Sequence, residues 1–178
     1  MMDPEEFKRR IRGPIQSIPT PFTANHDVDY DGVRRIIDVA IEGGVKVILT
    51  TAGDSQFGVL SMDEIKRLTK VMVGHVAGRA TVIAGTGSWW TKVAVKFAKY
   101  AEELGADGLM FLLTPEPFRQ ALTDEAKFRY HKAVADETRM GIVLQGWSGI
   151  SMPLIERITN EIDQVVAMKE DGGDRYYY

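Results

Sequence analysis

The segment KVILTTAGDSQFGVLSMDEIKRLTKVMVGHVAGRATVIAGTG, residues 46–87, contains one complete strand–helix–strand unit. Its ends, Lys46–Thr50 and Thr81–Ala84, are short runs rich in β-branched residues, which is typical of buried strands. The middle, Met62–Val76, has helical period, and Ser61 followed by Glu64 forms the capping box that begins a helix. Residues 46–87 therefore predict two strands joined by a helical crossover.

The same alternation continues in both directions along the chain. The further strand candidates are Gly13–Ile18, Asp107–Leu112, Gly141–Leu144 and Gln164–Met168. The further helix candidates are Asp3–Arg12, Tyr30–Glu42, Thr91–Leu104, Asp124–Glu137 and Met152–Glu161. Tyr30–Glu42 illustrates the helical period, because its apolar residues recur at i, i+3, i+4, i+7 and i+8 and form one stripe. The chain is thus predicted to repeat a βα unit of about 30 residues.

The predicted strands are nearly all apolar rather than alternating, which is typical of parallel strands buried on both faces. Two architectures fit such repeats, an open doubly wound sheet and a closed barrel. No glycine-rich dinucleotide-binding motif follows the first strand, which weakens the doubly wound alternative. Periodicity alone leaves the two architectures about equally supported.

Composition limits the function classes. The chain has 178 residues and a net charge of −3, so it has no electrostatic signature of nucleic-acid binding. It has no cysteine, and its three histidines are far apart in sequence, so we expect no disulfide and no metal site. No apolar run is long enough to span a bilayer, and the N-terminus lacks the apolar core of a signal peptide, so the default expectation is a cytoplasmic protein.

Chemistry is expected at the carboxyl ends of the strands, where parallel α/β folds place their active sites. In chain order, the segments that follow the predicted strands are Pro19–Phe22, Thr50–Ser55, Gly85–Ser88, Thr114–Pro117, Gln145–Ser148 and Lys169–Asp171.

This order of motifs resembles the dihydrodipicolinate synthase and N-acetylneuraminate lyase family. That family shows T-P-F/M, (G/S)-T-T-G-E-(S/T), A-G-T-G, T-P-Y-Y, Y-N-x-P and (I/F)-K-(E/D) after strands 1 to 6. The resemblance extends from about Gly13 to Asp174, and the shared order of the motifs is its most specific feature. It implies a (β/α)8 TIM barrel, here truncated after about six βα units, with residues 1–178 as one domain that lacks strands 7 and 8. A closed barrel of this type usually has about 250 residues, which agrees with a truncated chain.

The resemblance also implies a class I (Schiff-base) lyase that acts on a 2-keto acid, without a cofactor and as a homo-oligomer, either a dimer or a tetramer. Lys169 stands at the position of the Schiff-base lysine. The residue type suits this role independently, because a lysine at the end of the buried run Val165–Met168 is partly desolvated, and desolvation favours the unprotonated, nucleophilic amine. The structural alternative is a surface lysine at the start of a helix.

The loop after the second strand is expected to hold the carboxylate of the keto acid. In the family, hydroxyl and backbone N–H groups of this loop bind that group, and Thr51, Ala52 and Gly53 occupy the corresponding positions. Backbone donors at a turn suit an anion whatever the side chain. Asp54 replaces the usual glutamate, and Ala52 lacks the hydroxyl of the second family threonine.

Two departures from the family pattern concern proton transfer. Gln145 replaces the tyrosine that relays protons in the family, and an amide cannot act as a general acid or base near neutral pH. Glu116 and Pro117, which follow Thr114, replace a pair of tyrosines. Some 2-keto-3-deoxy sugar-acid dehydratases of this superfamily also carry glutamine at the former position, so dehydration competes with aldol chemistry. Proton transfer would then fall to Glu116, to Thr51 or to water.

The tryptophans Trp89, Trp90 and Trp147 all follow strand ends, which predicts either an aromatic-lined mouth or a subunit interface. With Trp147 as a substrate-binding residue, an aromatic aldehyde–pyruvate hydratase-aldolase is one alternative function. A second alternative is a non-catalytic member of the family that binds a small molecule, favoured by the missing tyrosines. Thr114 and Glu116 complete the predicted substrate-binding set.

Overall fold

The sheet of the protein consists of six parallel strands in sequential order. The computed structural model describes residues 2–51, 55–86, 90–111, 122–146 and 150–170. The strands are β1 (Ile15–Ser17), β2 (Val47–Leu49), β3 (Thr81–Thr86), β4 (Gly108–Phe111), β5 (Gly141–Gly146) and β6 (Val165–Glu170). Each strand pairs in parallel with the next. This order confirms the barrel-type prediction and excludes the doubly wound alternative, in which the strand order reverses.

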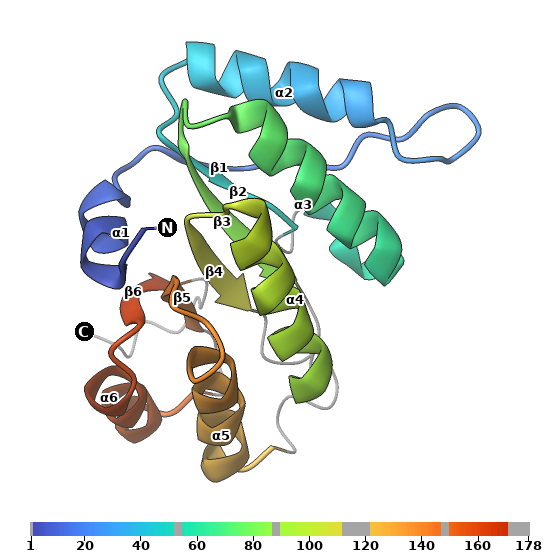
Figure 1. Cartoon of the computed structure of the whole chain (residues 1–178). Coiled ribbons are helices and arrows are strands. Elements are labelled where there is room, and N and C mark those ends of the chain that lie inside the picture. Colours follow the sequence, from blue (N-terminus) through green and yellow to red (C-terminus); the bar gives the residue numbers. More distant parts are fainter. Residues whose placement is uncertain (1, 52–54, 87–89, 112–121, 147–149, 171–178) are drawn as a thin grey trace.

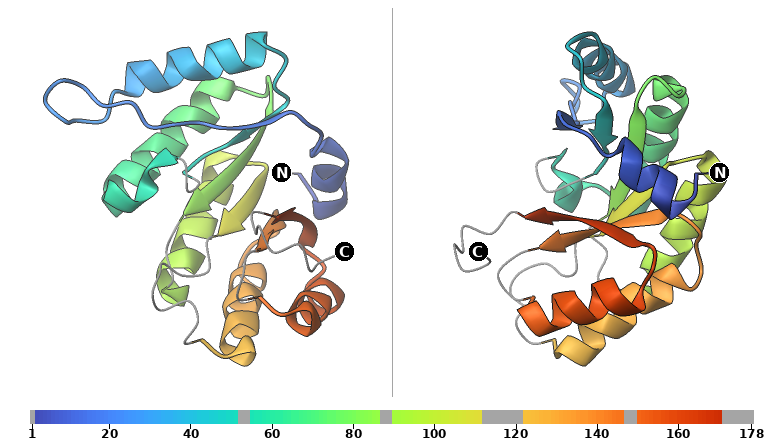
Figure 2. Two further views of the ribbon diagram at one scale, coloured as in Figure 1. Left: turned by 180° about the vertical axis from the view of Figure 1, so that it is seen from behind. Right: turned by 90° about the vertical axis from the view of Figure 1, so that its left-hand side faces the viewer.

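Helices lie on both sides of the curved sheet (Figure 1). They are α1 (Pro4–Arg10), α2 (Tyr30–Glu42), α3 (Met62–Val76), α4 (Thr91–Leu104), α5 (Asp124–Ala135) and α6 (Met152–Glu161), with a short 3-10 turn η2 (Phe57–Val59) before α3. Helices α2 to α6 follow one another along the outer side, as in the first five units of a barrel, whereas α1 lies on the inner side (Figures 1 and 2).

Local capping explains why most helix boundaries agree with the prediction. The predicted capping box is present, because the Ser61 and Glu64 side chains each bond the backbone of the other residue. Helix α4 ends at Gly105, whose φ of 84° is favourable only for glycine. Helix α5 ends two residues before the predicted Glu137, because the Glu137 N–H bonds to the carbonyl of Val134 and the chain tightens into a turn.

The interior of the sheet is closed at its amino end by α1. Phe7 of this helix is fully buried and packs against Gly108 of β4 and Gly141 of β5. It forms an apolar cluster with residues that face inward from the strands, namely Val47, Leu49, Ile83, Met110 and Val143.

The edge strands correct one expectation, that the strands are buried on both faces. The described residues of β2 to β5 are buried, but Ile15 of β1 is 48% exposed and Met168 of β6 is 43% exposed. The reason is that β1 and β6 each have a neighbour on one side alone within the described chain.

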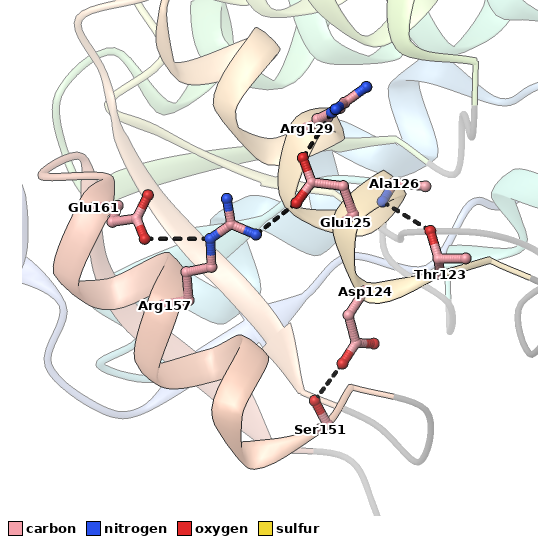
Figure 3. Close-up of polar contacts among 8 residues, drawn as sticks. All are labelled: Thr123, Asp124, Glu125, Ala126, Arg129, Ser151, Arg157 and Glu161. Atoms are coloured by element: carbon pink, nitrogen blue, oxygen red, sulfur yellow. Dashed lines mark hydrogen bonds and ion pairs between the residues drawn. The ribbon is translucent and has the colours of Figure 1, made fainter.

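A polar seam joins α5 to α6, the helix that leads into β6 (Figure 3). The Ser151 hydroxyl donates to Asp124 at 2.6 Å, and the Arg157 guanidinium donates to Glu125 at 2.6 Å. Hydrogen bonds from Arg157 and Arg129 hold the pKa of the Glu125 carboxyl below its ordinary value. These contacts hold α6, and therefore the start of β6, against α5.

Candidate active site

The carboxyl ends of β2 and β3 are joined by a closed network of two hydroxyls and one glycine. The Gly85 N–H donates to Thr50 Oγ1 at 3.2 Å, and the Thr51 hydroxyl donates to the Gly85 carbonyl oxygen. The two threonine oxygens are 3.4 Å apart. Since the Thr51 proton goes to the carbonyl, the remaining bond runs from the Thr50 hydroxyl to Thr51 Oγ1. The Thr51 oxygen is therefore oriented by its neighbours, not by solvent.

The backbone around Gly85 is packed too closely to accept a side chain without a shift. An added Cβ at Gly85 would lie 3.0 Å from the carbonyl oxygens of Met110 and of Thr50. Thr51 is 1% exposed and has a φ of 36°, which is an uncommon, strained conformation for a β-branched residue. Strained backbone conformations cluster at functional sites, where the surrounding structure maintains them.

The ends of β5 and β6 bring Gln145 and Lys169 together. The two residues are partners in the strand register, and alternation places them on the same face as their inward neighbours Val143 and Ala167. Gln145 is 4% exposed, whereas Lys169 is partly buried. A register shift between Ile142 and Val143 precedes this pair.

Lys169 faces the interior of the sheet. A cavity of about 340 Å³ is lined by Lys169 together with residues of all six strands, among them Ser17 of β1 and Met168 of β6. Its apolar wall includes Leu49, Ile83, Met110, Val143 and Ala167. Thr51 and Gln145 are not among its lining residues, although Gln145 belongs to β5 and Thr51 follows β2, and both strands contribute to the wall.

Comparison with known proteins identifies the family. The model of the dihydrodipicolinate synthetase family matches residues 10–178. The chain belongs to this family. The curated relatives include 4-hydroxy-tetrahydrodipicolinate synthases from Geotalea uraniireducens, 34% identical over 168 residues, and from Bacillus subtilis, 32% identical over 160 residues. These matches cover 92% and 87% of the chain but 56% and 54% of the relatives, so the chain spans about half their length.

Solved structures of the family share the fold. Dihydrodipicolinate synthase from Aquifex aeolicus superimposes with a TM-score of 0.84 at 28% identity. The match covers 90% of the present chain and 55% of the Aquifex aeolicus chain. The enzyme from Acinetobacter baumannii, solved in complex with pyruvate, gives a TM-score of 0.82 at 28% identity. This match covers 90% of the present chain and 55% of the Acinetobacter baumannii chain. The TIM-barrel prediction is thereby confirmed, with six strands of the barrel and the helices that follow the first five of them described.

Several predicted site residues lie outside the described residues. These are Ala52, Gly53, Thr114, Glu116 and Trp147. Trp89 also lies outside them, whereas Trp90 precedes α4, is 66% exposed and does not line the cavity. Trp90 therefore gives no support to an aromatic mouth.

The side chains with large pKa shifts belong to helix packing, away from the strand ends. His131 of α5 is buried, which lowers its pKa to about 4, and burial raises the pKa of Tyr130. Tyr130 stacks edge-on with Phe111 and with His131, at 6.4 and 5.5 Å between ring centroids. Tyr130 is therefore part of the core and does not replace the tyrosine that Gln145 displaces.

Thr50 is the residue that the sequence analysis missed. The family shows glycine or serine at its position, so a threonine there was the available signal. Among the described residues, no group of three or more His, Asp or Glu side chains is placed to hold a metal ion. Within the same residues, no helix has the length and apolarity needed to cross a membrane.

Proposed function

We propose that the protein is a class I lyase that forms an imine between Lys169 and a 2-keto acid. The observation that carries this proposal is the position of Lys169, partly buried at the carboxyl end of β6 and lining a cavity inside the sheet. An amine at this place can reach a keto carbon held inside the sheet, which is the placement that a Schiff-base lysine requires.

Imine formation would join the Lys169 nitrogen to the keto carbon of the substrate. The unprotonated Lys169 amine attacks the keto carbon, and the carbonyl oxygen leaves as water while the C=N bond forms. The protonated imine then accepts the electron pair of an adjacent bond. In aldol cleavage this is a C–C bond, and the other fragment leaves as a carbonyl compound. In dehydration it is a C–H bond, whose proton goes to a base, and the resulting enamine then expels the β-hydroxyl as water. This electron sink is the reason for assigning the protein to the lyases.

Thr51 and the following loop are proposed to orient the substrate. The Thr50–Thr51–Gly85 network directs the Thr51 proton towards a backbone carbonyl, so Thr51 Oγ1 presents lone pairs to a neighbouring donor. Backbone N–H groups of Ala52 and Gly53 are the predicted partners of the substrate carboxylate. Thr114, Glu116 and Trp147 remain predicted contacts for the rest of the substrate.

Dehydration of a 2-keto-3-deoxy sugar acid is the reaction we favour. Gln145 forms the strand pair with Lys169 but cannot exchange protons near neutral pH. In a dehydration, the substrate's own hydroxyl leaves as water, and ordered water or Glu116 can carry the protons. Condensation with an aldehyde depends more strongly on proton transfer by the family tyrosine, whose position Gln145 occupies. A homo-oligomer in the cytoplasm, as expected from the sequence, completes the proposal.

Imine trapping on the full-length protein tests the covalent step. Borohydride reduction with pyruvate is expected to attach one reduced pyruvyl group, and peptide mapping is expected to locate it on Lys169. Lys169→Arg should abolish the adduct, because a guanidinium keeps the charge without the nucleophile. Lys96→Arg, on the exposed face of α4, is the matched control and should label normally.

The outcome also separates the alternatives. No adduct under conditions that label the Bacillus subtilis enzyme would favour the non-catalytic binding member, which the loss of the tyrosine supports. An adduct with efficient turnover of an aromatic aldehyde and pyruvate would assign a hydratase-aldolase. Efficient condensation with aspartate semialdehyde would show that Gln145 is no obstacle to the synthase reaction.

A further inference from the structure

A basic hollow lies between α2 and α3, on the outer side of the sheet. It has a volume of about 640 Å³ and is lined by Arg34, Arg67, Lys70, Val71, Gly74 and His75. None of these six residues lines the cavity at Lys169. The two helices lie side by side (Figure 1). Three permanent cations and no carboxylate line this hollow, in a chain whose net charge is −3.

Intramolecular contacts hold three of the four basic groups in place. Arg34 donates to Asp31 at 2.5 Å, and His75 bonds Asp38 at 2.9 Å. The Arg67 guanidinium stacks on the Tyr30 ring, with its central carbon 4.1 Å from the ring centroid. These contacts reduce the side-chain entropy that a ligand would otherwise have to remove.

Two of these basic groups, Arg67 and Lys70, have no counterion within the described chain. Neither Arg67 nor Lys70 forms an ion pair with a described carboxylate. They are three residues apart on one helix, an arrangement in which like charges repel. An anion placed between them would turn this repulsion into attraction.

Gly74 shapes the wall of the hollow. It lies inside α3, where glycine destabilises a helix, and an added Cβ would meet no atom within 4 Å. Its φ lies outside the range that favours glycine, so neither packing nor backbone geometry requires it. Because glycine has no side chain, the surface of α3 at Gly74 is open to a ligand beside Lys70.

We propose that this hollow binds a phosphate-bearing small molecule with at least two negative charges. A guanidinium matches the paired oxygens of a phosphate, and an ammonium adds a point charge. The limited size of the hollow suits a small molecule, and the acidic net charge disfavours a nucleic acid. The proposal does not depend on the chemistry of Lys169.

Calorimetric titration of the full-length protein tests the proposal. The ligands are inorganic phosphate, inorganic tripolyphosphate, a sugar monophosphate and citrate, at ionic strength held constant with sodium chloride. We expect one tripolyphosphate per chain and weaker binding of inorganic phosphate. A sugar monophosphate that binds more tightly than inorganic phosphate would identify an organic phosphate as the source of the ligand chemistry.

Matched variants locate the site. Arg67→Gln with Lys70→Gln should weaken tripolyphosphate binding by at least tenfold. Lys92→Gln with Lys96→Gln, which removes two exposed cations from α4, should leave binding unchanged. Gly74→Glu should abolish binding, whereas Gly74→Ala should change it less than threefold. Circular dichroism and thermal melting check that each variant is folded.

Three results would overturn the proposal. They are the absence of tripolyphosphate binding at millimolar concentration, an equal loss of affinity in the α4 control, and citrate binding as tight as that of tripolyphosphate.

Discussion

The two ends of the sheet interior are built from opposite kinds of groups. At the amino end, the buried ring of Phe7 lies where side chains of Gly108 and Gly141 would be, since their Cβ atoms would approach it to 2.1 and 2.2 Å. At the carboxyl end, Thr51 and Lys169 provide a hydroxyl and an amine. Between the two ends lies the apolar cavity wall.

Because of this difference, we expect the amino end to contribute mainly to the stability of the fold and the carboxyl end mainly to the proposed chemistry. The Phe7 end is held by dispersion and apolar burial, which are insensitive to exact proton positions. The carboxyl end depends on which atom donates to which, because Thr50, Thr51 and Gly85 form one oriented network. Substitutions at the two ends should therefore alter different measurements.

The largest effect is expected from Lys169→Met. It removes the proposed nucleophile, so turnover of the proposed 2-keto acid substrate should fall at least ten-thousand-fold, more than about 5 kcal/mol of transition-state stabilisation. The free energy of unfolding should change by less than about 1 kcal/mol, because Lys169 is partly exposed. Steady-state kinetics and chemical denaturation measure the two quantities. A large loss of stability with partial retention of turnover would reverse the assignment of this end to chemistry.

The opposite result is expected from Phe7→Ala. Loss of the ring leaves a cavity at the amino end and should lower the free energy of unfolding by about 3 to 5 kcal/mol. Imine trapping at Lys169 in the folded fraction should continue at a similar rate. Phe22→Ala is the matched control, since Phe22 is 39% exposed and its loss should cost less than about 1 kcal/mol. Trapping that disappears with the Phe7 ring would show that the two ends are coupled.

Gly85→Ala should test how tightly the threonine network is packed. The added methyl meets two carbonyl oxygens at 3.0 Å, so we expect a destabilisation of about 1 to 3 kcal/mol and slower trapping. Gly74→Ala adds the same methyl in open space within a helix and should stabilise the protein by about 0.5 to 1 kcal/mol. Equal effects of the two alanines on the denaturation midpoint would contradict the close approach at Gly85.

Thr50→Val should lower stability less than Phe7→Ala does, and it should give the most specific effect on the site. Valine keeps the shape but leaves the buried Gly85 N–H without its acceptor, which should cost about 1 to 2 kcal/mol. Thr50→Ser retains the hydroxyl and should preserve both stability and the pH dependence of trapping. If valine and serine give the same pH profile, Thr50 does not orient Thr51.

Local sequence was sufficient for the elements themselves. Helices α2, α3, α4 and α6 have the predicted limits, because capping residues and apolar periodicity act within a few residues of each boundary. The order of motifs at the strand ends was sufficient to recognise the family. It also singled out Lys169, which the structure places at the edge of a cavity.

Tertiary structure decided the contacts between distant parts of the chain. The bond from Gly85 to Thr50 spans 35 positions, and its existence depends on the register of β2 against β3. The packing of Phe7 on Gly108 and Gly141 requires the curvature of the sheet, which no local pattern encodes. The exposure of Ile15 and Met168 likewise follows from their edge positions. Residue type and spacing determined which groups were available for chemistry, whereas strand register and sheet curvature determined which of them meet.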